Sequence, residues 1–124
     1  MATAQKFYLD GLKLYGQQKF AEAIAAYEQS LALKADDPEV LHALATALSK
    51  SGSHDAAIAM LDKVIALTPN DPFVYTSLSV FLQRKGLIPE AETAGAKARM
   101  LAWKEELKKN PNAPPPEGGF KVMQ

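Results

Sequence analysis

A repeat of 34 residues, running three times in register from Ala4 to Glu105, constrains the fold of this chain most strongly. Rows of similar residues recur at this interval: Ala23, Ala57 and Ala91; Phe7, Leu41 and Tyr75; and Leu14, Leu48 and Leu82. Repeats of this length are small units that cannot bury their apolar face alone and become stable by stacking. Because such arrays present a curved surface and seldom carry chemistry of their own, the repeat favours a binding function.

Each unit is expected to fold into two helices. The units span residues 4–37, 38–71 and 72–105, and in each of them apolar residues recur at spacings of three and four. Asp37 and Asp71 each precede a proline, which is the pattern of an N-cap carboxylate followed by proline at the first helical position. The glycines expected to end the first helices of the second and third units are Gly52 and Gly86. The fold class predicted is therefore all-α, an α-solenoid of three antiparallel helix pairs.

The third unit departs from the pattern at its end. Trp103 stands where a closing proline is expected, and apolar residues continue to Leu107. This predicts one long final helix from about Pro89 to Lys109. A last helix that overruns its repeat can cover the exposed apolar end of the stack, so we interpret it as a capping helix.

Residues 110–124 form a tail rich in proline and glycine, which excludes a helix there. The tail ends in three apolar residues, Phe120, Val122 and Met123. Two interpretations stay open: a disordered terminus, or a short adhesive motif on a proline spacer. Such a motif would dock into the groove of its own chain, into that of a second copy, or onto a partner.

Composition excludes several classes of function. The chain of 124 residues is long enough for one domain, and its 14 basic and 14 acidic residues cancel. It therefore lacks the positive charge expected of a nucleic-acid binder. There is no cysteine, no apolar run long enough to span a membrane, and no apolar stretch behind a basic N-terminus. We expect a cytoplasmic protein that binds neither nucleic acid nor membrane.

These rows resemble the tetratricopeptide repeat family, whose unit is also 34 residues in two antiparallel helices. The second unit matches the family pattern at Leu41, Leu44, Ala45, Leu48, Ala57, Leu61 and Pro69. The first unit departs from it at Asp10 and Ala35, and the third at Gly95, where an aromatic residue is usual. The resemblance covers residues 4–105, and three units in unbroken register make it specific.

The resemblance implies a right-handed superhelix whose concave wall is built from the first helix of each unit. Family members mostly bind peptides or partner proteins on that wall. The family's inner-wall positions, transferred to this sequence, predict a peptide-binding groove lined by Tyr8, Leu9, Leu12, Tyr15, His42, Thr46, Ser49, Phe73, Thr76, Val80 and Gln83. Several of these are apolar, and an exposed apolar patch usually marks a partner site. The alternative interpretation is that some of the rings pack against neighbouring helices.

One subgroup of the family is disfavoured by the residues at its binding positions. Its co-chaperones hold the acidic C-termini of heat-shock proteins with a clamp of lysine, asparagine and arginine side chains. The matching residues here are Tyr8, Leu12, Ala43, Phe73 and Ser77. None of these side chains can bind a terminal carboxylate by charge, so the expected ligand is an apolar or aromatic segment.

Catalytic and metal chemistry find no support in the sequence. His42 and His54 are twelve residues apart with no cluster of carboxylates near them, so neither is expected to bind a metal. The chain contains no nucleophile elbow and no phosphate-binding loop. We therefore expect no enzymatic activity and no cofactor.

Three functions remain after these exclusions. The first is an adaptor or scaffold that binds a peptide segment in its concave groove. The second is a dedicated chaperone that shields one client protein, in which case loss of the chain destabilises the client. The third is a scaffold that self-assembles through tail-to-groove contacts, which would make its size depend on concentration.

Overall fold

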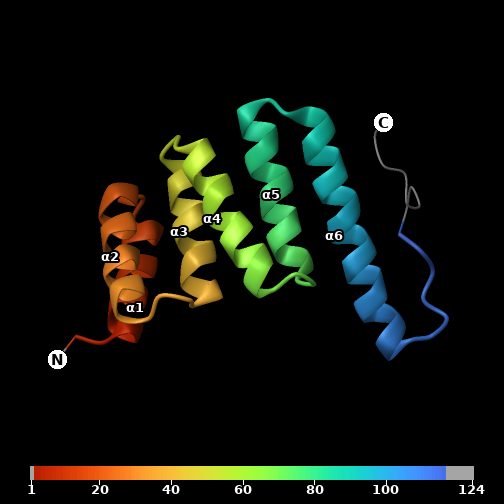
Figure 1. Cartoon of the computed structure of the whole chain (residues 1–124), viewed down its shortest axis with the longest axis horizontal. Coiled ribbons are helices and arrows are strands. Elements are labelled where there is room, and N and C mark those ends of the chain that lie inside the picture. The colour runs from red at the N-terminus through yellow and green to blue at the C-terminus, as the bar shows by residue number, and fades with distance from the viewer. Residues whose placement is uncertain (1, 117–124) are drawn as a thin grey trace. The chain divides into compact units, whose positions relative to one another are not determined.

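The computed structural model describes residues 2–116 and contains six α-helices and no strand within that range (Figure 1). The helices are α1 (Ala4–Gly16), α2 (Phe20–Leu33), α3 (Pro38–Lys50), α4 (His54–Leu67), α5 (Pro72–Lys85) and α6 (Ile88–Lys109). They form the three antiparallel pairs α1–α2, α3–α4 and α5–α6. The all-α class of paired helices is therefore confirmed, and so is a long last helix that ends at Lys109.

The chain divides into two compact units between Thr68 and Pro69. The first unit contains α1 to α4, and in it α2 packs against α3 in addition to the packing within each pair. The second unit contains α5 and α6, which pack against each other. Each unit therefore has its own packing and its own surface.

The same hydrogen bond closes the turn inside every helix pair. The backbone N–H of Lys19 donates to the carbonyl of Leu14 over 2.9 Å. The bonds from Ser53 to Leu48 and from Leu87 to Leu82 have the same length and fall at the same position of the repeat. Bonds of this kind satisfy carbonyl groups that the end of a helix leaves without an intrahelical partner. The 34-residue period of the sequence is therefore also the period of the backbone turns.

A left-handed residue ends the first helix of each pair. Gly52 and Gly86 have φ angles of 94° and 88°, which confirms their predicted role. In the first helix pair, α1–α2, Gln18 occupies this position with a φ of 62°. The turn requires the left-handed conformation, which costs a residue with a side chain roughly 1–2 kcal/mol. Gln18 thus adopts the left-handed conformation that the turn requires, although a residue with a side chain disfavours it.

The helices α3 and α5 begin at the caps that the sequence predicts. The side chain of Asp37 accepts a hydrogen bond from the backbone of Glu39 over 3.1 Å, and Asp71 accepts one from Phe73 over 2.9 Å. Each aspartate is followed by proline at the start of its helix. These carboxylates satisfy backbone donors that would otherwise have no partner.

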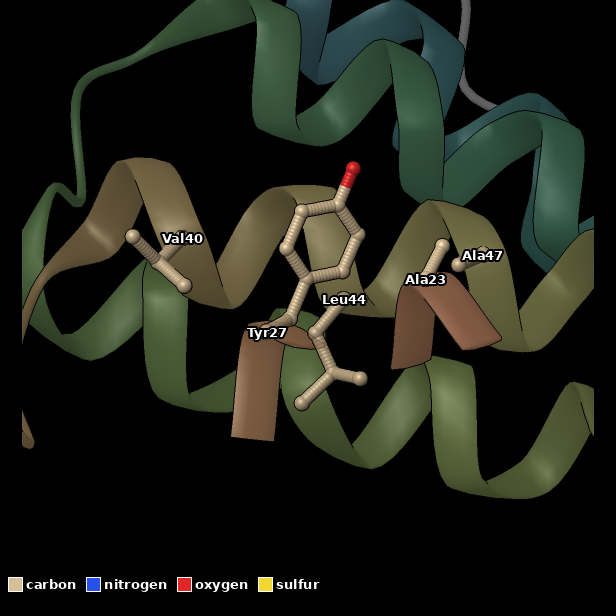
Figure 2. Close-up of a cluster of buried hydrophobic side chains, with 5 residues drawn as sticks. All are labelled: Ala23, Tyr27, Val40, Leu44 and Ala47. Atoms are coloured by element: carbon tan, nitrogen blue, oxygen red, sulfur yellow. The ribbon is translucent and has the colours of Figure 1, made fainter. Parts of the chain in front are cut away.

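The core of the first unit lies between α2 and α3. Figure 2 shows Ala23 and Tyr27 of α2 beside Val40, Leu44 and Ala47 of α3. Tyr27 is 1% exposed and is one of the largest fully buried side chains among residues 2–116. The other buried members of this cluster are small or aliphatic, so the tyrosine ring supplies much of its buried area.

A glycine on α1 makes room for the Tyr27 ring. A Cβ atom placed on Gly11 would lie 2.6 Å from Cδ1 of Tyr27, closer than real carbon atoms approach. The ring therefore lies directly on the backbone of α1. Small residues also allow close packing elsewhere, because Ala23, Ala57 and Ala91 are all 0% exposed.

The third helix pair packs without such a ring. Two repeat lengths after Gly11 and Tyr27 the sequence has Ser79 and Gly95. Ser79 is buried, and its hydroxyl donates to the carbonyl of Ala91 over 2.7 Å. The contact between α5 and α6 at this level is therefore made by a serine and the helix backbone.

The described part of the tail, residues 110–116, returns beside α6 (Figure 1). The indole N–H of Trp103 donates to the carbonyl of Ala113 over 3.1 Å, and Ala113 is 8% exposed. This stretch is not helical, as predicted, and it packs on α6 through these contacts. Phe120, Val122 and Met123 lie outside the described residues.

Replacing Gly11 by alanine tests the contact between α1 and Tyr27. The added methyl group has no room, so Gly11→Ala should lower the free energy of unfolding by about 1–3 kcal/mol. Urea denaturation followed by circular dichroism measures the change. Gly16→Ala is the matched control, because no atom lies within 4 Å of a Cβ built there. Equal stability of the two variants would show that Tyr27 does not rest on Gly11.

Candidate peptide-binding surface

The predicted groove residues of α1 fall into two groups. Leu9 and Leu12 are 52% and 41% exposed, so both offer apolar area to a ligand. Tyr8 and Tyr15 are half-buried and pack against the core cluster of the first unit. Some of the predicted groove rings were alternatively expected to pack against neighbouring helices. This applies in part to Tyr8 and Tyr15, because each of them also packs against the core.

A hollow of about 200 Å³ lies between α1 and α3 in the first unit. Its lining residues are Leu12, Tyr15, Tyr27, Ala43 and Thr46. Tyr15 is held at one side by the ring of Phe20, with the ring centroids 5.4 Å apart in an edge-on arrangement. Thr46 donates its hydroxyl to the carbonyl of His42 over 3.0 Å, which leaves the wall of the hollow largely apolar.

Tyr8 links α1 to α3 through a hydrogen bond. Its hydroxyl donates to a carboxylate oxygen of Glu39 over 3.0 Å, and its ring centroid lies 6.1 Å from that of Tyr27. Partial burial and this bond to a carboxylate raise the pKa of Tyr8 from its ordinary value of 10.0 to about 12. Burial also raises the pKa of Tyr27. The two tyrosines therefore stay neutral over the physiological range.

Two predicted groove residues of α3 are less accessible than expected. Ser49 is only 3% exposed, so its side chain does not line an open groove as the repeat pattern predicts. The repeat assigns Ser49 to the inner wall, but tertiary packing covers its side chain. His42 is half-buried, and its carbonyl accepts the hydrogen bond from Thr46.

The second unit contains a larger hollow, of about 460 Å³, between α5 and α6. All four groove residues predicted on α5 line it: Phe73, Thr76, Val80 and Gln83. Phe73 is 75% exposed, the highest value among the exposed large apolar residues within 2–116. Because a ring this exposed contacts little of its own chain, it is available for contact with a ligand.

The opposite wall of this hollow comes from α6 and was not predicted from the sequence. It is formed by Gly95, Ala98, Arg99 and Ala102. The inner-wall positions of the family lie on the first helix of each pair. Because α6 is a second helix, transferring those positions to this sequence predicted no groove residue on it. The sequence feature that could have indicated a hollow on α6 is Gly95. It lies two repeat lengths after Tyr27 and has no side chain to fill the corresponding space.

Residues 2–116 contain no group of three or more His, Cys, Asp or Glu side chains that could hold a metal ion. His54 begins α4, and its Nδ1 atom is buried without a hydrogen-bond partner. Within the same residues no helix has the length and apolar character needed to cross a membrane.

The arrangement around both hollows is suited to contact with apolar groups.

Comparison with known proteins identifies the repeat. Residues 14–80, more than half of the chain, match the family model described as tetratricopeptide repeat. No curated protein sequence matches the chain.

Solved structures with the same fold include three helical-repeat proteins. MamA is 26% identical with a TM-score of 0.78, and the match covers 84% of this chain and 61% of the MamA chain. This chain thus spans less than two thirds of MamA.

The Yersinia enterocolitica secretion chaperone SycD, in complex with a peptide of the translocator YopD, is 23% identical with a TM-score of 0.75. That match covers 85% of this chain and 81% of SycD. The first repeat domain of Spaghetti (RPAP3), bound to the HSP90 peptide SRMEEVD, is 20% identical with a TM-score of 0.76. Here the match covers 86% of this chain and 89% of that chain.

The raised pKa of Tyr8 makes stability sensitive to alkaline pH. Below pH 10 the hydroxyl is protonated in both states, so its contribution is fully present. As the pH rises from 10 to about 12, the unfolded chain ionises first, and this contribution is lost. Chemical denaturation at a series of pH values should show a smaller loss of unfolding free energy in Tyr8→Phe than in the wild type. Identical pH profiles would contradict the Tyr8–Glu39 bond.

Proposed function

This chain belongs to the tetratricopeptide repeat family of protein-interaction modules, and we propose that it is a non-catalytic adaptor that binds an apolar or aromatic peptide segment. Each unit supplies a binding surface of its own: the hollow between α1 and α3 in the first unit, and the hollow between α5 and α6 in the second. The cytoplasmic location expected from the sequence stays a prediction.

The observation that supports this proposal most is the concentration of exposed apolar side chains on α1 and α5. Leu9 and Leu12 on α1, and Phe73 and Val80 on α5, are each at least 36% exposed. Three of the four line a hollow. Apolar side chains beside a hollow provide what a peptide anchor residue needs, which is a desolvated pocket with little polar competition.

The charge around the first hollow favours an apolar ligand over an acidic one. None of its five lining residues is charged. Glu39, on the same helix as Ala43 and Thr46, carries a carboxylate that already accepts the hydroxyl of Tyr8. An acidic peptide would gain no ion pair from the lining and would be repelled by Glu39.

Peptides of partner proteins occupy two of the similar structures. SycD was solved with a YopD peptide, and the Spaghetti domain with the HSP90 peptide SRMEEVD. Both likenesses concern the fold, and they support the use of this fold for peptide binding. The chemistry of the ligand proposed for this chain rests on its own lining residues.

Lysine substitutions in the two hollows should remove the partner without unfolding the chain. Leu12→Lys and Phe73→Lys each place a charge in an apolar hollow at an exposed side chain, so we expect at least a tenfold loss of a partner's affinity for the double variant, about 1.4 kcal/mol or more. Affinity capture from lysate of the source cells, with quantitative mass spectrometry, identifies the partner, and calorimetry then measures its affinity. Tyr8 and Tyr15 are poorer choices because both pack on the core.

Leu33→Lys is the matched control. Leu33 is 59% exposed, lies at the end of α2 and lines neither hollow. This variant should capture the same partner as the wild type, with unchanged affinity. If the double variant retains the partner, the hollows are not the binding surface. If the control also loses the partner, the effect is a general one of surface charge.

The acidic heat-shock peptide provides a second test of ligand chemistry. Fluorescence polarisation with labelled SRMEEVD should show no saturable binding to this chain at concentrations at which the Spaghetti domain, used as the positive control, is saturated. The physical reason is that the lining of the first hollow is uncharged, and Arg99 is the single charged residue that lines the second. Saturable binding with comparable affinity would contradict the proposed preference for apolar segments.

A further inference from the structure

Residues 113–116, here called the strap, return beside the last helix of the second unit (Figure 1). The indole N–H of Trp103 donates to the carbonyl of Ala113 over 3.1 Å, and Ala113 is buried. Pro114 and Pro116 line a hollow together with Trp103 and other residues of α6. One face of α6 therefore holds a proline-rich segment of its own chain.

This contact has the chemistry by which proteins recognise proline-rich segments. Three successive prolines, Pro114 to Pro116, restrict the backbone to the extended polyproline II conformation, which has no hydrogen bonds within the segment. Such segments dock on surfaces lined by aromatic side chains. Trp103 is suited to this task, because it lines the hollow beside the prolines and its N–H reaches the carbonyl that precedes them.

Trp103 is the single tryptophan of the chain and has no counterpart in the other repeats. One and two repeat lengths earlier the sequence has Pro69 and Ala35, and α4 has already ended at Leu67. In the third repeat α6 continues to Lys109, so the indole lies on a part of the helix that the other second helices lack. The Trp103 contact is therefore an addition to the repeat rather than a repeated packing position.

The strap does not fill the space in which it lies. A hollow of about 300 Å³ remains between the strap and α6, and its helix side is lined by Arg99, Ala102, Trp103 and Glu106. A ligand with a larger apolar side chain among its prolines would bury area here that the strap leaves open. The two charged lining residues have opposite signs, so the hollow favours a segment without a large net charge.

The turn that leads into the strap favours the chain's own segment over that of a second copy. The backbone N–H of Asn110 donates to the carbonyl of Glu106 over 2.8 Å, and that of Ala113 donates to the carbonyl of Asn110 over 3.0 Å. So short a tether gives the strap an effective concentration of roughly millimolar. An identical segment on a second copy does not reach this concentration in dilute solution. Displacement of the strap therefore requires a different segment that binds more tightly.

We propose that the Trp103 face of α6 is a further ligand site, which binds a proline-rich segment of a partner protein in the polyproline II conformation. The strap is the built-in occupant that this segment displaces. The proposal goes beyond the adaptor surface and does not depend on it, because Trp103 and Glu106 line neither of the hollows assigned to the adaptor.

The indole N–H resonance of Trp103 reports on the strap, because the chain contains no second indole. In the full-length wild type this proton should be hydrogen-bonded and should exchange slowly with water. Ala113→Asp places a charge at a buried position of the strap and should move the resonance to the random-coil value. Asn112→Asp, which adds the same charge at the exposed neighbouring residue, is the control and should leave the resonance in place.

Titration with decaproline, a soluble polyproline II probe, tests the site itself. The full-length Ala113→Asp variant should bind the probe in a saturable manner, with the shift of the Trp103 indole resonance as the signal. The wild type should bind it about tenfold more weakly or worse, because the strap competes for the site. A glycine–serine peptide of the same length is the control ligand and should shift the resonance in neither protein.

A second variant tests the indole donor. Trp103→Phe removes the N–H and keeps an aromatic ring at this position. Introduced into the Ala113→Asp chain, it should weaken decaproline binding by about threefold to tenfold, as expected for the loss of one hydrogen bond. The shifts of the α6 amide resonances measure this affinity, and circular dichroism verifies that the helix content is retained. Equal affinities would exclude Trp103 as the anchor.

Two results of the first measurement would overturn the proposal: a random-coil indole resonance in the wild type, or an unchanged one in Ala113→Asp. So would a released variant that fails to bind decaproline or binds the glycine–serine peptide equally well. Strap contacts that appear only between differently labelled molecules would assign the site to a second copy instead. None of these results involves Leu12 or Phe73, so partner capture tests the adaptor proposal separately.

Discussion

The contact between the Tyr27 ring and the backbone of α1 determines how the first unit is built. Because Gly11 has no Cβ, the ring lies against α1 while α3 covers its other side with Val40 and Leu44. One side chain thereby joins three helices, which a helix pair alone cannot do. This is how a repeat that is too small to form its own core obtains one from the next repeat.

In the third repeat this contact is missing. With Gly95 in place of the ring and no further repeat after it within the described residues, α5 and α6 leave a hollow of about 460 Å³. The binding capacity proposed for the second unit derives from this difference. In the first unit a smaller hollow of about 200 Å³ remains beside Tyr27, bordered by Leu12 and Tyr15. Each unit thus keeps a hollow with apolar lining residues.

The parts of the structure that depend on local spacing were predictable from the sequence. The turns recur at the repeat interval, the caps at Asp37 and Asp71 form as expected, and the last helix ends at Lys109. The accessibility of the groove residues was not predictable, because it depends on contacts between helices. Ser49 occupies an inner-wall position yet is buried. The return of residues 110–116 onto α6 also required the structure, since it rests on the bond between Trp103 and the Ala113 carbonyl, which no periodicity indicates.

The central claim is that partners bind at the apolar hollows beside first helices. Mapping the amide resonances of the full chain while the captured partner's segment is titrated in tests this claim most directly. Binding at the hollows predicts that the resonances that shift belong to α1, α3, α5 and the part of α6 that lines the second hollow, with Leu12 and Thr46 among them. Shifts confined to the exposed faces of α2 and α4 would contradict it.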